Sequence, residues 1–143
     1  MTVENLTVLN AQLNNFNSPI GFRATDVSCV SRDGRRIQFV NHSEVPGLTE
    51  KCLTMFEENM ARAIQIDDIS FSCALFWIGF IAIHPFMDAN GRTAKAVIAK
   101  ELNKKRFHMI TFDLIDRYLI EGNIDEDLGV LQKLFLASIE PIQ

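Results

Sequence analysis

The order of apolar and polar positions divides the chain into a short helical start, a β segment and a longer helical remainder. Apolar residues recur at helical spacing near the beginning, which predicts an amphipathic helix within residues 1–17. Several asparagines in this segment oppose the helix, because asparagine is a weak helix former. The apolar positions of the expected helix are Leu6, Leu9, Leu13 and Phe16.

Residues 18–43 favour β structure, since β-branched and aromatic residues gather in two short runs, 27–30 and 36–40. Asp33 and Gly34 lie between the runs, and an Asp-Gly pair at that place is typical of a tight hairpin turn. A two-stranded hairpin alone is marginally stable in water. We therefore expect it to lie against the helices that follow.

From residue 44 onward the spacing is helical. We expect Ser43 to cap the first of these helices, with Pro46 in its first turn. The apolar face of this helix comprises Val45, Leu48, Cys52, Phe56 and Met60.

A second helix is expected to begin near Asp67 and to end at Ile83, because Pro85 disfavours helical geometry at His84. Its stretch 73–83 is the most apolar part of the chain, but it is shorter than the roughly 20 residues of a membrane span. The stretch therefore predicts a helix that is buried on all sides.

Three further helices are expected at about 90–104, 112–121 and 126–139, with Gly122 and Asn123 as a stop between the last two. The predicted fold class is mainly α, with one β-hairpin ahead of the central helices. A length of 143 residues, of which 48% are apolar, suits a single domain with one packed core.

Composition and charge narrow the function classes. The net charge of -4 argues against general binding to nucleic acid or to anionic membranes. The 3 cysteines are an odd number without a CxxC pair, which favours reduced thiols over a disulfide framework or a zinc site. Residues 1–10 lack the basic and apolar runs of a secretory signal. We therefore expect a cytoplasmic protein, and delivery into a host cell stays open.

The segment between the second and third of these helices carries the candidate chemistry. A buried helix ends in His84, and a carboxylate follows at Asp88. The small residues Ala89 and Gly91 allow the backbone to approach a ligand closely. A new helix then begins at about Asn90, and free N–H groups at a helix N-terminus favour phosphate.

The charged groups of this segment fit phosphate chemistry. Arg92 and Lys95 are three residues apart on the new helix, where two cations are unfavourable unless an anion lies between them. Asp88 can hold magnesium (Mg²⁺) that bridges phosphates. His84, with an ordinary pKa near ~6.5, can act as general base for an attacking hydroxyl. Each residue alone is more often a cap or a solvated charge, and only their joint spacing favours a site.

Residues 84–95 resemble the motif of the Fic family, H-x-F-x-(D/E)-(G/A)-N-(G/K)-R-x-x-(R/K), at every named position. The resemblance extends to residues 21–23, 36–40 and 44–48, and to the tail 111–139, so it covers about 20–140. It implies a Fic-like helical bundle with one β-hairpin flap near the active-site loop. Residues 1–19 are then an N-terminal helix or tail of this single domain.

The resemblance implies a protein adenylyltransferase, which moves AMP from ATP to a serine, threonine or tyrosine hydroxyl of a target protein. Phe86 is expected to point into the core. The implied roles are general base for His84, magnesium ligand for Asp88, anion hole for Asn90, Gly91 and Arg92 beside Ala89, and γ-phosphate contact for Lys95. The flap residues Arg36, Ile37, Gln38 and Phe39 are expected to pair with an extended segment of the target.

Three positions bear on the reaction. Ala89 replaces the commoner glycine and tightens the loop. Lys95 replaces the commoner arginine and cannot make a bidentate fork, so we expect weaker γ-phosphate orientation, and reduced activity or a relaxed nucleotide preference. Gly91 favours AMP transfer, because Doc-type members that phosphorylate their targets have a lysine there, which would fill the α-phosphate space.

Regulation and alternatives complete the picture. Many Fic proteins are inhibited by a helix with the motif (S/T)-x-x-x-E-(G/N). We interpret its one match, residues 54–59, as chance, and Glu121 with Gly122 as a helix-ending turn. Inhibition is then absent, lost with sequence outside the chain, or supplied by an antitoxin-like partner.

The alternatives to AMP transfer are Doc-like phosphorylation, UMP or phosphocholine transfer, a weakly active nucleotide-binding regulatory module and, ranked last, a plain helical domain.

Overall fold

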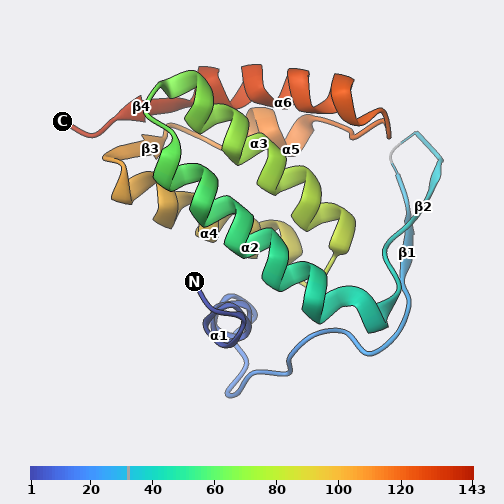
Figure 1. Cartoon of the computed structure of the whole chain (residues 1–143). Helices are drawn as coiled ribbons and strands as arrows, with labels where there is room; N and C mark the ends of the chain where they lie inside the picture. Colours follow the sequence, from blue (N-terminus) through green and yellow to red (C-terminus); the bar gives the residue numbers. More distant parts are fainter. Residues whose placement is uncertain (32) are drawn as a thin grey trace.

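The computed structural model describes residues 1–31 and 33–143, which form a bundle of helices with a hairpin at one end (Figure 1). The elements are α1 (Val3–Leu13), β1 (Ser28–Val30), β2 (Arg36–Gln38), the 3-10 helix η1 (His42–Glu44), α2 (Val45–Arg62), α3 (Ile66–Ile83), α4 (Asn90–Lys104), β3 (Phe107–Met109), α5 (Asp113–Arg117), α6 (Ile124–Ser138) and β4 (Ile139–Pro141).

Helix α3 is the centre of the core, because it packs against α2, α4 and α6 (Figure 1). By length and composition it could cross a membrane, but 56% of the helix is buried inside the protein. Between residues 73 and 83 only Ala82 is exposed, which confirms the expected buried helix. The apolar composition of α3 is thus explained by packing on several sides at once.

The start of α2 differs from the expectation. Ser43 does not cap this helix, because it lies in η1, where its N–H and Oγ both donate to Asn41 Oδ1 over 2.9 and 2.7 Å. Helix α2 then begins without a side-chain cap, and Pro46 lies in its first turn as predicted. The buried stripe is also rotated from the predicted one: Leu48 and Cys52 are half-buried, and the buried residues are Val45, Thr49, Leu53, Phe56 and Met60.

The end of the chain contains a second small sheet that the sequence pattern did not predict. Strands β3 and β4 pair antiparallel, with Met109 opposite Ile139. Three-residue strands are too short to show an alternating pattern, which explains the omission. Helix α5 is shorter than expected and ends at Arg117, and Asn123 caps α6 by accepting from the Glu126 N–H.

The predicted hairpin is present at the end of the bundle opposite β4 and the C-terminus (Figure 1). Cys29 lies opposite Ile37, and Gly34 adopts a φ of 84° in the connecting turn. Arg35 donates from the hairpin to the carbonyls of Ile120 and Glu121, over 3.1 and 2.8 Å. The hairpin therefore does lie against the rest of the domain, as its marginal stability requires.

Candidate active site

The corner between α3 and α4 is bounded by two residues in the left-handed region. His84 ends α3 with a φ of 50°, and Ala89 precedes α4 with a φ of 62°. Such conformations cost of order 1 kcal/mol or more for a residue other than glycine, and they persist only where the surroundings hold them. The contacts of this corner therefore identify the residues that shape the site.

Asn90 is one of these residues, since its side chain closes the loop on itself. Its Oδ1 accepts from the Phe86 N–H over 2.9 Å, and its Nδ2 donates to the Phe86 carbonyl over 2.8 Å. The Phe86 ring is buried in the core and packs against Phe22, which confirms its predicted position. The Asn90 amide is thus occupied by the loop, and the contribution to anion binding expected of this residue narrows to its backbone N–H.

Helix α1 supports the same corner from the other side. Asn10 is buried and donates from Nδ2 to the Asp88 carbonyl over 2.9 Å and to Thr93 Oγ1 over 3.2 Å. Arg92 donates to the Leu13 carbonyl over 3.0 Å. Asn10 was not predicted as a site residue, although an asparagine on the same helical face as Leu6 and Leu13 was the available signal.

These contacts shape an open cleft of about 420 Å³. It is lined by Phe39, Ile81, His84, Met87, Asp88, Ala89, Asn90, Gly91, Arg92 and Lys95. The structure thus brings together the motif residues predicted for catalysis, metal binding and nucleotide binding, and it adds Phe39 from the end of the flap. The other predicted flap residues, Arg36, Ile37 and Gln38, lie on β2 and do not line the cleft.

The imidazole of His84 lies on the flap side of the cleft. It stacks on Phe39 with 3.9 Å between ring centroids and 12° between the planes. Burial lowers the pKa of His84 below its usual value, and the charge of Arg23 acts in the same direction. Its Nδ1 is buried without a hydrogen-bond partner in the part of the chain that the structure describes. A neutral imidazole beside an open cleft is suited to accept a proton.

The start of α4 offers backbone N–H groups to the cleft. No side chain caps the helix at Ala89, and the Thr93 N–H is the first to bond back, to the Ala89 carbonyl over 2.9 Å. Within residues 1–31 and 33–143, the N–H groups of Asn90, Gly91 and Arg92 have no protein acceptor. Three free donors at the positive end of a helix are chemically suited to bind an anion, and the anion hole expected from the sequence stays a prediction.

The glycine in this turn is not required by packing. A Cβ at Gly91 would meet only a ring carbon of Trp77, at 4.0 Å, which is ordinary contact. The backbone there does not have a positive φ either. A side chain could therefore be accommodated by the protein, and its absence leaves the cleft open directly over the helix N-terminus.

The two cations of the motif are held by different partners. Arg92 lies 3.9 Å from an Asp88 oxygen and is half exposed. Lys95 forms an ion pair of 2.7 Å with Asp116 of α5, and its Nζ lies 5.9 Å from the centroid of the Phe112 ring. Asp116 was not predicted as a partner of Lys95, and the phosphate expected between Arg92 and Lys95 stays a prediction.

Asp88 presents an exposed carboxylate at the mouth of the cleft. One oxygen accepts from the Ala89 N–H over 2.7 Å. The described residues contain no cluster of three or more potential metal ligands. Mg²⁺ commonly binds one or two carboxylates together with substrate phosphates and water, so a single exposed carboxylate fits that mode.

Comparison with known proteins settles the family. A family model of the Fic/DOC family matches residues 2–102, a range that includes α1 and the complete corner. The chain belongs to this family. No curated protein matches it in sequence.

Solved structures of Fic proteins share the fold. BepC, a VirB-translocated effector from Bartonella tribocorum with bound AMPPNP, is 16% identical, with a TM-score of 0.71 over 99% of this chain and 76% of that one. The N-terminal Fic domain of a putative cell filamentation protein from Bartonella quintana is 17% identical, with a TM-score of 0.73 over 99% and 72%. A Fic-domain signaling protein from Bacteroides thetaiotaomicron is 13% identical, with a TM-score of 0.67 over 96% and 60%. The predicted Fic-like helical bundle with a hairpin flap is confirmed.

The two segments that resemble the Fic inhibitory motif can be located in this fold. The match at residues 54–59 lies on α2, where Glu58 pairs with Arg62 at 3.7 Å. Lys95 pairs with Asp116 instead. The match therefore does not supply the partner of Lys95 in this structure. Gly122, which with Glu121 also resembles the end of the inhibitory motif, has a φ of 98° and lies in the turn before α6.

Proposed function

We propose that this Fic protein transfers AMP from ATP to a serine, threonine or tyrosine hydroxyl of a target protein. The observation that carries the proposal is the position of His84 in the same cleft as the uncapped start of α4. The hydroxyl oxygen bonds to the α-phosphorus, and its proton passes to the imidazole of His84. The bond from the α-phosphorus to the bridging oxygen breaks, and pyrophosphate leaves.

The phosphate groups are assigned to the other side of the cleft. The backbone N–H groups of Asn90, Gly91 and Arg92 donate to the α-phosphate, and the charged side chains of Arg92 and Lys95 offset the charge of the β- and γ-phosphates. When bound by Asp88 together with the phosphates, magnesium (Mg²⁺) would offset their negative charge. The AMPPNP in BepC and the ADP in a Bartonella quintana Fic domain support a nucleotide as the ligand.

Gly91 supports AMP transfer over phosphorylation. The open space above this residue is where a lysine would stand in Doc-type members, and a glycine leaves that space for the α-phosphate. The alternatives are a Doc-like kinase, transfer of UMP, and a weakly active nucleotide-binding module. The ion pair of Lys95 with Asp116 is the observation behind the last of these alternatives, because it occupies the cation proposed for the γ-phosphate.

The flap is the proposed contact for the target protein. Strands β1 and β2 form a sheet of two strands, so within the described residues each has an edge that could pair with an extended segment. An antitoxin-like partner that inhibits the enzyme is also proposed, because the motif match on α2 pairs internally. The proposed location is the cytoplasm, where the three free thiols are stable.

Mass spectrometry of modified peptides tests the proposal. Purified protein is incubated with Mg²⁺, cell lysate and either ATP or UTP, beside a His84→Asn variant. The proposal predicts lysate peptides that carry AMP on a hydroxyl side chain, absent from the variant. Phosphate on those peptides would support the kinase, and UMP would support the other nucleotide. If no peptide carries AMP, phosphate or UMP and calorimetry still detects ATP binding, the result supports the nucleotide-binding module instead.

A further inference from the structure

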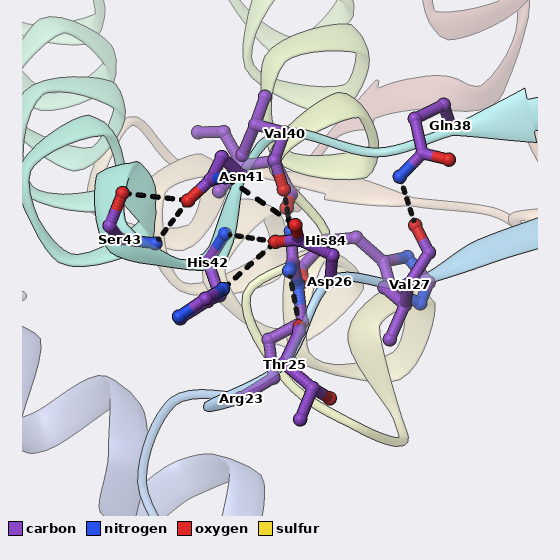
Figure 2. A network of polar contacts seen from close by, with 11 residues as sticks. Arg23, Thr25, Asp26, Val27, Gln38, Val40, Asn41, His42, Ser43 and His84 are labelled. Atoms are coloured by element: carbon purple, nitrogen blue, oxygen red, sulfur yellow. Dashed lines mark hydrogen bonds and ion pairs between the residues drawn. The ribbon is translucent and has the colours of Figure 1, made fainter.

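Arg23 is a buried cation that joins the flap to the active-site corner (Figure 2). Only 3% of the residue is exposed. Its guanidinium donates exclusively to backbone carbonyls in the described structure, those of Thr25 at 2.8 Å, Val40 at 2.5 Å, Ile83 at 3.0 Å and His84 at 2.6 Å. Its own N–H donates to the Pro85 carbonyl over 2.9 Å.

On the corner side, Arg23 completes the end of α3. The carbonyls of a last helical turn have no partner within the helix, and the helix dipole makes that end negative. The guanidinium donates to the carbonyls of Ile83 and His84, and its positive charge also offsets the negative end of the helix dipole. His84 is the residue in the left-handed conformation, so a fixed carbonyl there also fixes the direction in which the imidazole leaves the backbone.

On the flap side, Arg23 binds the segment that follows β2 of the hairpin. Val40 follows Phe39, whose ring stacks on the imidazole of His84. The flap and the corner are therefore joined twice, by the stack of Phe39 on His84 and by the buried guanidinium of Arg23. Asp26 secures the adjoining segment, since its carboxylate accepts from the His42 N–H over 2.8 Å.

We infer that Arg23 is a positioning residue that sets the flap at a fixed place relative to His84. The inference rests on the proposed function for its consequence: a hydroxyl presented by the flap reaches the imidazole only if these two segments keep their distance. None of the hydrogen bonds of Arg23 in the described structure reaches Asp88, Arg92 or Lys95. Its loss therefore affects presentation of the target and leaves nucleotide binding intact.

The planar guanidinium is necessary for this arrangement. Arginine offers five donors in a fixed fork, whereas lysine offers one ammonium group on a flexible stem. Arg23→Lys keeps the charge, but it cannot reach carbonyls of the entry segment, the flap and the corner together. The matched control is Lys105→Gln, because Lys105 donates to the Ala63 carbonyl over 2.9 Å beyond the far end of α4, about 22 Å along that helix from the cleft.

Hydrogen exchange measured by NMR on the whole chain is the primary test, and it does not require activity. The two reporters are the Phe39 N–H, bonded to Val27 in the flap, and the His84 N–H, bonded to Phe80 at the end of α3. In Arg23→Lys we expect both to exchange about tenfold faster or more, as loss of charged hydrogen bonds implies. Lys105→Gln leaves both unchanged. If only one reporter responds, or neither, the inference is wrong.

A second variant decides the case in which Arg23→Lys does not fold. Phe39→Leu removes the ring stack on His84 and leaves the bonds of Arg23 in place. The inference predicts that the N–H groups of residues 39 and 84 keep their protection, because the guanidinium still joins the segments. Faster exchange of both N–H groups would show that the ring stack, and not Arg23, joins the flap to the corner, and it would overturn the inference.

Two functional measurements separate this inference from the proposed function. Calorimetry with AMPPNP should give the same Kd for the wild type and Arg23→Lys, within about twofold. Incorporation of α-labelled AMP into lysate protein should fall about tenfold or more in the variant. A weaker Kd would contradict a role limited to the target side. If the wild type transfers no AMP, the proposed function fails. The hydrogen-exchange measurement still tests whether Arg23 joins the flap to the corner.

Discussion

Lys95 of α4 and Asp116 of α5 form an ion pair at the edge of the cleft, with 2.7 Å from Nζ to each carboxylate oxygen. The side chains are 26% and 44% exposed, so solvent weakens the attraction without removing it. The cation that we propose for the γ-phosphate is therefore already paired. A nucleotide that uses Lys95 must compete with Asp116 for it.

Asp116→Asn should therefore strengthen ATP binding. A partly exposed pair contributes up to about 1 kcal/mol, so we expect the Kd for ATP to fall about two- to fivefold. Asp113→Asn is the matched control, since Asp113 lies on the same short helix and makes no ion pair among the described residues. Calorimetry at low salt gives the comparison. Equal affinity in the wild type and Asp116→Asn would show that Lys95 does not contact the nucleotide.

The rate of transfer should remain high below neutral pH. Burial lowers the pKa of His84 from its ordinary 6.5, and the charge of Arg23 lowers it further. A general base acts in its unprotonated form, so a lowered pKa keeps it active at pH 7. We expect the acid limb of the pH–rate profile to have its midpoint below 6.5. A midpoint above that value would mean that another group, or a repositioned His84, limits the reaction.

Gly91→Lys should remove AMP transfer and preserve the fold. The protein has room for a side chain here, because only a Trp77 carbon lies within 4.0 Å of the added Cβ. The lysine would instead occupy the space assigned to the α-phosphate. Gly91→Ala is the control, since it adds one methyl group and should raise stability by about 0.5–1 kcal/mol as a helical glycine replacement. Thermal unfolding and AMP incorporation are measured for both. Undiminished transfer by Gly91→Lys would contradict the placement of the phosphate.

Asn90→Ala should destabilise the protein. It removes both hydrogen bonds to the buried Phe86 backbone and leaves an N–H and a carbonyl without partners. At about 1–3 kcal/mol for each of the two groups, the expected loss of unfolding free energy is about 2–6 kcal/mol. Urea unfolding measures it, beside Asn59→Ala on α2, for which a change within about 0.5 kcal/mol is expected. A loss below about 1 kcal/mol would mean that the loop does not depend on Asn90.

The sequence predicted the helices around the site well because local signals mark their ends. Pro85 ends α3 at Ile83, and α4 begins at Asn90, as the sequence predicted. The hairpin followed from Asp33 and Gly34. These signals depend on residues that are close together in the chain, and a sequence pattern reveals relationships of that kind.

The supports of the site could not be predicted in the same way. Arg23 binds carbonyls up to 61 residues away in the chain, and an arginine is usually solvated. Asp116 meets Lys95 only because α5 is placed beside α4. Asn10 belongs to a helix in which asparagine was counted only as a weak helix former. All three contacts depend on how the elements pack in three dimensions, and the periodicity of apolar residues in the sequence carries no information about that packing.

The position of the label transferred from ATP tests the central claim most directly. Wild-type protein and His84→Asn are incubated with Mg²⁺ and lysate, once with α-labelled and once with γ-labelled ATP. Asparagine is chosen because it tolerates the left-handed conformation of residue 84, so the corner can keep its shape. We predict label on protein from α-labelled ATP alone, reduced about a hundredfold or more in the variant, with ATP binding unchanged. Label from γ-labelled ATP alone, or equal transfer by the variant, would contradict AMP transfer with His84 as the base.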